Sequence, residues 1–104
     1  GKGKTSSYVY ALKKISTPKV TKKSKNYIKI SWTNIPGESG YQIARSTKKS
    51  SGYKAIKTAS YKYKTLNIKT TRNKTYYYKI RAYKTVNGKK IYGPWSSPRK
   101  YKLR

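Results

Sequence analysis

Lysine and arginine are the side chains with which this chain could do chemistry. There are 28 of them against a single acidic residue, Glu38, which gives a formal net charge of +27 at pH 7. The chain has no histidine and no cysteine, so it lacks the usual general base and the usual zinc ligands. One carboxylate cannot form an acid–base pair, and a serine or threonine without a basic or acidic partner stays unactivated. We therefore predict that the protein is not an enzyme and that it needs no metal or other cofactor.

Eight of the cations lie in three polar segments whose composition is typical of turns. The basic residues of these segments are Lys22, Lys23, Lys25, Lys48, Lys49, Lys69, Arg72 and Lys74. Clustered cations can hold a polyanion through many weak phosphate, sulfate or carboxylate contacts. Lysine predominates over arginine, which favours diffuse attraction over the bidentate contacts that read base edges. We predict that the cations bind a polyanion without sequence specificity.

A second candidate site lies on residues 76–83, an aromatic stretch without glycine or proline whose alternation is typical of a strand. One face of such a strand carries Tyr76, Tyr78, Ile80 and Ala82. The other face carries Tyr77, Lys79, Arg81 and Tyr83. If the first face is turned to a core, the second exposes rings beside cations, which can stack on bases or sugars while the charges hold backbone anions. The simpler interpretation is that tyrosine and lysine commonly face outward on half-buried strands. A slip of one residue would exchange the two faces.

Turn signals divide the rest of the chain into further short strands. Few aliphatic residues and a high net charge are typical of disorder, but 13 tyrosines and two tryptophans can bury a large apolar area. The expected strands span residues 15–21, 27–32, 41–46, 53–58, 61–68, 76–83 and 91–103. Pro18 is typical of an edge strand, the imperfect alternation of 53–58 indicates a bulge, and Asn87-Gly88 predicts a hairpin. Besides those of 76–83, the expected core-facing residues are Ile28, Ile30, Trp32, Tyr41, Ile43, Tyr53, Ile56, Leu66, Ile68, Tyr101 and Leu103. No segment has helical periodicity, so we predict an all-β protein, a seven-stranded antiparallel β-sandwich.

The organisation along the chain follows from the same signals. Residues 1–14 open with a polar, glycine-containing segment, which we expect to be a linker or the tail of a preceding module. Residues 15–104 are expected to form the domain. No apolar run is long enough for a membrane-spanning helix, and no signal peptide is recognisable. We expect a monomeric unit with neighbouring domains in a longer chain.

Four segments occur in an order and at a spacing that resemble a known family. They are Ile28-Lys29-Ile30-Ser31-Trp32, Ser39-Gly40-Tyr41-Gln42-Ile43-Ala44-Arg45-Ser46, Thr75-Tyr76-Tyr77-Tyr78-Lys79-Ile80-Arg81-Ala82-Tyr83 and Tyr92-Gly93-Pro94-Trp95-Ser96-Ser97. By these segments, residues 15–104 resemble a fibronectin type III domain of the kind found in secreted multidomain proteins of Gram-positive bacteria. The resemblance implies an immunoglobulin-like sandwich with Trp32 as its core tryptophan. It also implies that Tyr76 forms a tyrosine corner, its hydroxyl bonded to upstream backbone. Thr70 stands where the family has a leucine, so Ile68 or Leu66 is expected to take that role and the register of the strand stays open.

The resemblance further implies where the charges gather. In the fibronectin type III topology the A–B turn (residues 22–26), the C–C′ turn (residues 47–52) and the E–F turn (residues 69–74) gather at one pole, and these are the three basic turns. The B–C loop (residues 34–40) lies at the other pole. The opposite pole would hold Glu38, with Lys89 and Lys90 from the F–G turn. We accordingly expect a secreted or cell-surface module that adheres through these turns to a polyanion: DNA or RNA, teichoic acid, or an acidic polysaccharide. The alternatives are a passive spacer in a tandem array, a deliberately supercharged scaffold, and an intracellular nucleic-acid-binding protein.

Overall fold

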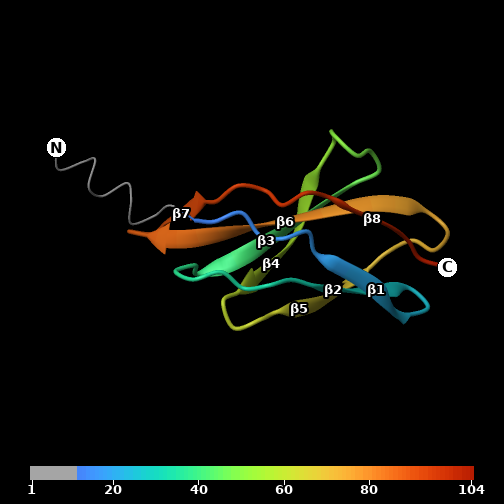
Figure 1. The fold of residues 1–104 in the computed structure, drawn as a ribbon. Coiled ribbons are helices and arrows are strands. Elements are labelled where there is room, and N and C mark those ends of the chain that lie inside the picture. The colour runs from blue at the N-terminus through green and yellow to red at the C-terminus, as the bar shows by residue number, and fades with distance from the viewer. Residues whose placement is uncertain (1–11) are drawn as a thin grey trace.

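Two antiparallel β-sheets face each other in the computed structural model, which describes residues 12–104 (Figure 1). Eight strands form within those residues: β1 (Lys19–Ser24), β2 (Tyr27–Ser31), β3 (Gly40–Ser46), β4 (Lys54–Ser60), β5 (Thr65–Lys69), β6 (Thr75–Val86), β7 (Lys89–Tyr92) and β8 (Arg99–Lys102). One sheet has the order β1-β2-β5. The other has the order β4-β3-β6, and both β7 and β8 pair with the far side of β6. The predicted antiparallel β-sandwich is therefore confirmed. The described residues contain no helix that could cross a membrane.

The strand count differs from the prediction because the expected strand 91–103 is divided in two. Its first part pairs with Tyr83–Val86 of β6 as β7, and its last part pairs with Thr75–Tyr78 as β8. The interruption contains Pro94 and Pro98, which have no N–H to give to a ladder. The chain nonetheless stays beside β6, because Gly93 N donates to Ala82 O at 2.9 Å and Ser96 N donates to Ile80 O at 2.8 Å.

The first strand begins later than predicted. Residues 12–18 are irregular, Pro18 is buried just before the ladder starts, and β1 then runs through to Ser24 with a bulge between Lys22 and Ser24. The predicted turn 22–26 is thus wrong except for its last two residues, which form the tight turn. A proline outside the ladder costs no hydrogen bond, which explains the shift toward Ser24.

Two other strands confirm the pattern in part. The predicted bulge in 53–58 is present: Ile43 pairs with Lys57 and Ala44 with Ala55, so Ile56 is the extra residue of β4. The predicted strand 61–68 forms only from Thr65 onward, because residues 61 and 62 make a turn. The hairpin at Asn87-Gly88 is confirmed, with positive φ at both residues as a type I′ turn requires.

The core between the sheets is filled mainly by residues that the alternation pointed inward. Tyr53 is an exception: it was expected to face the core, but it is half-buried and its ring lies beside Lys79 on the outward face. Ile28, Ile30, Ile43 and Ile80 have no exposed surface, and Tyr78 is only 1% exposed. The predicted parity of the 76–83 strand is therefore confirmed. Trp32 is buried as well and contacts the Tyr41 ring in a tilted arrangement at 5.4 Å between centroids.

Candidate anion-binding surfaces

The A–B and E–F turns lie against each other at one end of the sandwich. Tyr27 pairs with Lys69 at the last rung between β2 and β5, and Thr70 N donates to Asn26 O at 2.9 Å. The carboxyl end of the chain joins them, because Asn73 N donates to Leu103 O and Lys22 Nζ donates to Arg104 O at 3.0 Å. All of these segments meet at the right-hand end of Figure 1. The predicted residues that this end brings together are Lys22, Lys23, Lys25, Lys69, Arg72 and Lys74.

The C–C′ turn with Lys48 and Lys49 lies at the same end, on the other sheet. Ser46 pairs with Tyr77 near the start of β6, so the turn leaves β3 beside the E–F segment. Arg45 connects the two sheets here, because its guanidinium donates to Lys69 O at 3.2 Å. We call the eight predicted cations of the three turns the basic pole: Lys22, Lys23, Lys25, Lys48, Lys49, Lys69, Arg72 and Lys74.

Two further cations at this end were missed by the sequence reasoning. Lys102 pairs with Thr75 at the last rung of β8, and Arg104 follows two residues later. Both side chains are exposed. The signal was available: a last strand antiparallel to 76–83 must end where that strand begins, which is beside the E–F turn.

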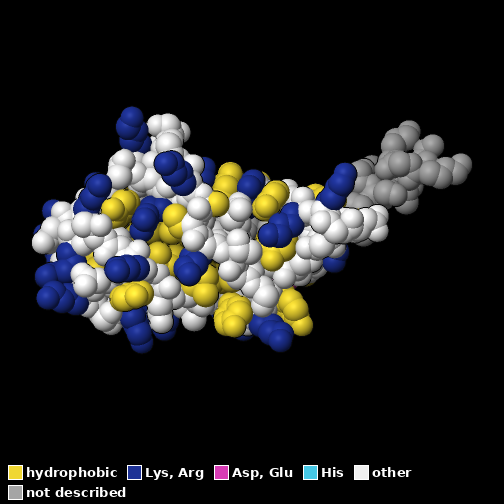
Figure 2. All heavy atoms as spheres, turned by 180° about the vertical axis from the view of Figure 1, so that it is seen from behind, with side chains coloured by type: hydrophobic (Ala, Val, Ile, Leu, Met, Phe, Trp, Pro, Cys, Tyr) yellow, Lys and Arg dark blue, Asp and Glu magenta, His cyan; other side chains and the backbone are white. Residues whose placement is uncertain are grey.

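The electrostatics of the basic pole follow from the position of the only acidic side chain. Glu38 lies in the loop after β2, at the end opposite the A–B turn, and its carboxylate accepts a hydrogen bond from the Tyr41 hydroxyl. The same hydroxyl accepts from Ile35 N at 3.0 Å. Burial, followed by the bond to Glu38, raises the pKa of Tyr41. Glu38 is thus engaged far from the basic pole, whose cations have no acidic side chain to pair with. Figure 2 shows the back of the molecule, with lysine and arginine side chains gathered at its left end and scattered between exposed apolar side chains.

The outward face of β6 holds a stack of rings and cations that we call the ladder: Tyr53, Lys79, Trp95, Arg81 and Tyr92. Lys79 Nζ lies 4.0 Å from the Tyr53 ring centroid and 4.7 Å from that of Trp95. The Arg81 guanidinium lies 3.7 Å from the Tyr92 centroid and 4.2 Å from the Trp95 centroid. Burial lowers the pKa of Lys79, and the neighbouring charge of Arg81 adds to this. The cations of this face are therefore covered by rings of their own protein.

The sequence predicts that Tyr77, Lys79, Arg81 and Tyr83 form an exposed row. This prediction is wrong for Tyr83, which is buried. Tyr83 is only 9% exposed, because its ring lies over Gly40, where a Cβ would collide with it. Tyr77 is half-buried. Sequence reasoning could not find the covering rings, because Tyr53, Tyr92 and Trp95 come from other segments and reach β6 only through the sheet register.

Comparison with solved structures identifies this architecture. The solution structure of a fibronectin type III domain derived from human KIAA0970 protein matches with a TM-score of 0.73 at 17% identity, covering 99% of this chain and 82% of that one. The fold is that of a fibronectin type III domain. The FN1–FN3 domains of chicken CNTN1 match at a TM-score of 0.72 and 20% identity, over 91% of this chain and 31% of that one. The sixth such domain of human fibronectin type III domain containing protein 3 matches at 0.66 and 17% identity, over 89% and 86%. No family model and no curated protein matches the chain.

The tyrosine of the fibronectin type III corner differs from the expectation. Within residues 12–104, the Tyr76 hydroxyl makes no hydrogen bond, and its ring is instead covered by Arg45 at 4.5 Å. Tyr78 makes the buried contact in its place: its hydroxyl lies 3.2 Å from Thr70 Oγ1. Thr70 is itself buried, so the family's leucine position is filled by a polar side chain that satisfies Tyr78. Ile68, on the preceding inward position, is 3% exposed.

A second feature missed from the sequence is the turn at residues 61–64, which we call the Tyr-Lys turn: Tyr61, Lys62, Tyr63 and Lys64. Tyr61 is 57% exposed and Tyr63 53%, the largest values among the exposed large hydrophobic side chains of the described residues. Tyr61 N donates to Ser39 O at 3.0 Å, which places the turn at the Glu38 end. That end therefore carries two more cations than the sequence reasoning assigned to it. The alternation Tyr-Lys-Tyr-Lys predicts a strand, whereas residues 61 and 62 form a turn and the strand begins only at Thr65.

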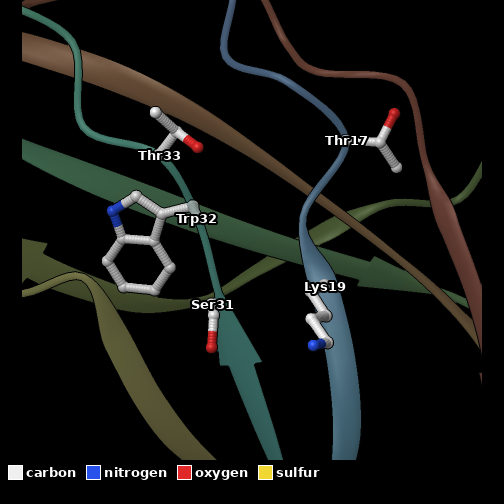
Figure 3. A pocket seen from close by; sticks show the side chains of 5 residues that line it. All are labelled: Thr17, Lys19, Ser31, Trp32 and Thr33. Carbon is white, nitrogen blue, oxygen red and sulfur yellow. The ribbon is translucent and has the colours of Figure 1, made fainter.

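A shallow hollow of about 240 Å³ lies beside the core tryptophan. Its lining residues are Thr17, Lys19, Ser31, Trp32 and Thr33 (Figure 3). The indole nitrogen of Trp32 is buried without a hydrogen-bond partner, but Figure 3 shows it turned away from Thr17 and Lys19. The hollow thus offers hydroxyls and one ammonium but no unsatisfied group directed into it.

Proposed function

We propose that this fibronectin type III fold is a non-enzymatic adhesion module that holds polyanions at the basic pole. Fibronectin type III domains are generally non-catalytic binding or spacer modules. The observation that supports the proposal is the contact between the lysine-rich A–B and E–F turns at the end of the molecule opposite Glu38, with the C–C′ turn leaving β3 toward the same end. A polymer with closely spaced phosphate, sulfate or carboxylate groups could contact several of these cations at once and release its counterions.

The destabilising effect of the net positive charge supports a binding role for the cations. A net charge of +27 on 104 residues destabilises the compact state through self-repulsion, and solubility alone does not require the near-complete loss of acids. A bound polyanion offsets that repulsion. The partner classes that fit are extracellular DNA or RNA, teichoic acid and acidic polysaccharide, and a secreted or bacterial cell-surface location is part of the proposal.

The passive spacer is the second candidate, and one observation favours it. Leu12 lies against Gly93 at one end of the sandwich, while Leu103 is bonded to Asn73 at the other. A chain that continues at both sides would leave from opposite poles, as modules in a tandem array do. A spacer needs no cations at either pole, so binding measurements separate the two functions.

Charge reversal with a matched control tests the proposal. Lys22, Lys23, Lys48 and Lys49 are changed to glutamate, and the control variant carries the same change at Lys13, Lys14, Lys57 and Lys89, which are exposed and outside the basic pole. Affinity for duplex DNA and for heparin is measured by fluorescence anisotropy across salt concentrations. We expect the pole variant to lose far more affinity than the control. We also expect its log–log salt slope to become shallower by about 0.9 for each phosphate contact removed.

The outcomes decide between the models. Equal losses in the two variants would overturn the basic pole and leave only diffuse charge. Absence of binding by the unaltered protein at physiological salt would leave the spacer.

A further inference from the structure

We propose that the Tyr-Lys turn is a stacking site for single-stranded nucleic acid, separate from the basic pole. The turn lies at the opposite end of the molecule, and its composition differs from the pole in having two exposed rings. The pole would hold any polyanion, whereas this turn would distinguish unpaired bases from a duplex. The inference therefore goes beyond the proposed function and does not require it.

The backbone of the Tyr-Lys turn is fixed from both sides. Tyr61 N donates to Ser39 O at 3.0 Å, and Asn34 Nδ2 donates to Tyr61 O at 3.3 Å. Tyr63 N donates to Ser60 O at 3.1 Å, and Trp32 N donates to Lys64 O at 3.0 Å. Because the peptide groups are bonded to the B–C loop and to the end of β2, the side chains project from a scaffold that needs little ordering on binding.

The side chains of the turn suit a strand of alternating planar and anionic groups. Tyr61 and Tyr63 are both more than half exposed, and each is followed by an exposed lysine. Residues two apart are separated by at most about 7 Å, so the two rings can accept bases close together on one strand. A base stacks on an aromatic ring whatever its identity, while the adjacent ammonium groups attract the phosphates. In a duplex the bases are already stacked on each other, so the rings have no free base to accept.

Charge and ring availability favour this turn over the ladder. In the ladder the cations Lys79 and Arg81 occupy the ring faces of Tyr53, Trp95 and Tyr92. No cation–ring contact involves Tyr61 or Tyr63 within the described residues. The nearest carboxylate by sequence, Glu38, is engaged by the Tyr41 hydroxyl.

The test compares three ligands and two tyrosine variants by fluorescence anisotropy. The ligands are a short oligothymidine, a DNA duplex of the same length, and heparin. The first variant is Tyr61→Ser with Tyr63→Ser. The matched control is Tyr92→Ser, whose ring is 39% exposed on β7, outside both the Tyr-Lys turn and the basic pole. We expect the double variant to lose about fivefold or more in affinity for oligothymidine per ring, with duplex and heparin affinities within twofold of the unaltered protein. The control should leave all three affinities unchanged.

Each other outcome overturns the inference. A loss of less than twofold for oligothymidine would show that the rings are not used. Equal losses for all three ligands would show a general effect, and a loss confined to heparin would assign the turn to sugar stacking instead. The proton resonances of the Tyr61 and Tyr63 rings in the unaltered protein give a second reading: they should shift upfield on addition of oligothymidine, and unchanged resonances would contradict stacking.

The results also separate this inference from the proposed function. Binding of heparin and duplex DNA with no effect of the tyrosines would remove only the stacking site. Binding of oligothymidine alone, lost in the double variant, would remove only the basic pole.

Discussion

Thr70 and Tyr78 show how a polar side chain can be buried in a fibronectin type III core where an apolar one was expected. Both side chains are buried, and their hydroxyls are each other's partners at 3.2 Å. A buried hydroxyl without a partner costs about 1–3 kcal/mol, whereas replacing both partners by apolar groups of similar shape can be nearly neutral. The pair is therefore coupled, and neither residue can be exchanged alone without loss.

A double-mutant cycle measures this coupling. We expect Thr70→Val to lower the free energy of unfolding by about 1–3 kcal/mol, because it leaves the Tyr78 hydroxyl buried without a partner. Tyr78→Phe should have a similar effect through Thr70. The double variant should be much less destabilised than the sum of the two, as measured by urea denaturation. Additive losses would show that the hydroxyls do not depend on each other.

Glu38 likewise provides a hydrogen-bond partner for a buried hydroxyl. It is the only acidic side chain among 104 residues, and its carboxylate accepts the hydroxyl of the wholly buried Tyr41. A buried hydroxyl needs an acceptor, so this carboxylate has a structural use that no surface acid would have. The carboxylate of Glu38 therefore serves the core rather than the charge balance of the surface.

At the level of elements, the ladder joins the residue before β4, the strands β6 and β7, and the segment after β7 on the outward face of the larger sheet. Trp95 is its central ring, because both Lys79 and Arg81 lie over it. Each such contact stabilises by about 0.5–1 kcal/mol at an exposed site. The two cations are held on the sheet without any carboxylate, which is how this surface accommodates charge that cannot form ion pairs.

Removal of the Trp95 ring tests whether the ladder stabilises the fold. Trp95→Ala should lower the free energy of unfolding by at least about 1 kcal/mol, since both cation contacts are lost. It should also raise the pKa of Lys79 toward the usual lysine value of 10.5, because burial is the main cause of its lowering. Unfolding in urea and an NMR titration of the Lys79 side chain measure the two effects. Trp95→Phe keeps a ring and should retain most of both, and a Lys79 pKa that is unchanged in Trp95→Ala would contradict this role for the ladder.

The alternation of apolar and polar residues predicts which strands form and which residues face inward. It predicts less well where the strands begin and end and which distant segments pack beside them. The inward positions of β2, β3 and β6 follow from it because one buried face requires a period of two. The first strand was displaced by a buried proline, and the last was divided by two prolines whose backbone still follows β6. The basic pole could be anticipated once the order of strands was known. The ladder, the pairing of Tyr78 with Thr70 and the exposure of the Tyr-Lys turn could not, since each depends on which distant segment packs beside it.

At the scale of the whole molecule, repulsion among 28 cations opposes a core that must hold the two sheets together. The single carboxylate offsets almost none of it, so mobile anions must supply the screening. We therefore expect the melting temperature to rise with sodium chloride concentration, most steeply at low salt, where the screening length is longest. Differential scanning calorimetry across salt concentrations measures this.

A polyanion should act on stability differently from simple salt. Screening by chloride depends only on ionic strength, whereas a ligand that binds the folded chain more tightly than the unfolded one stabilises it by mass action. At equal ionic strength we expect heparin to raise the melting temperature above the chloride value, and the charge-reversed basic pole to lose most of that excess while the control variant keeps it. A melting temperature that does not change with sodium chloride would show that geometry already accommodates the repulsion. A heparin effect equal to that of chloride would show that the unfolded chain binds the polymer as well as the folded one, so that the basic pole adds nothing to the charge alone.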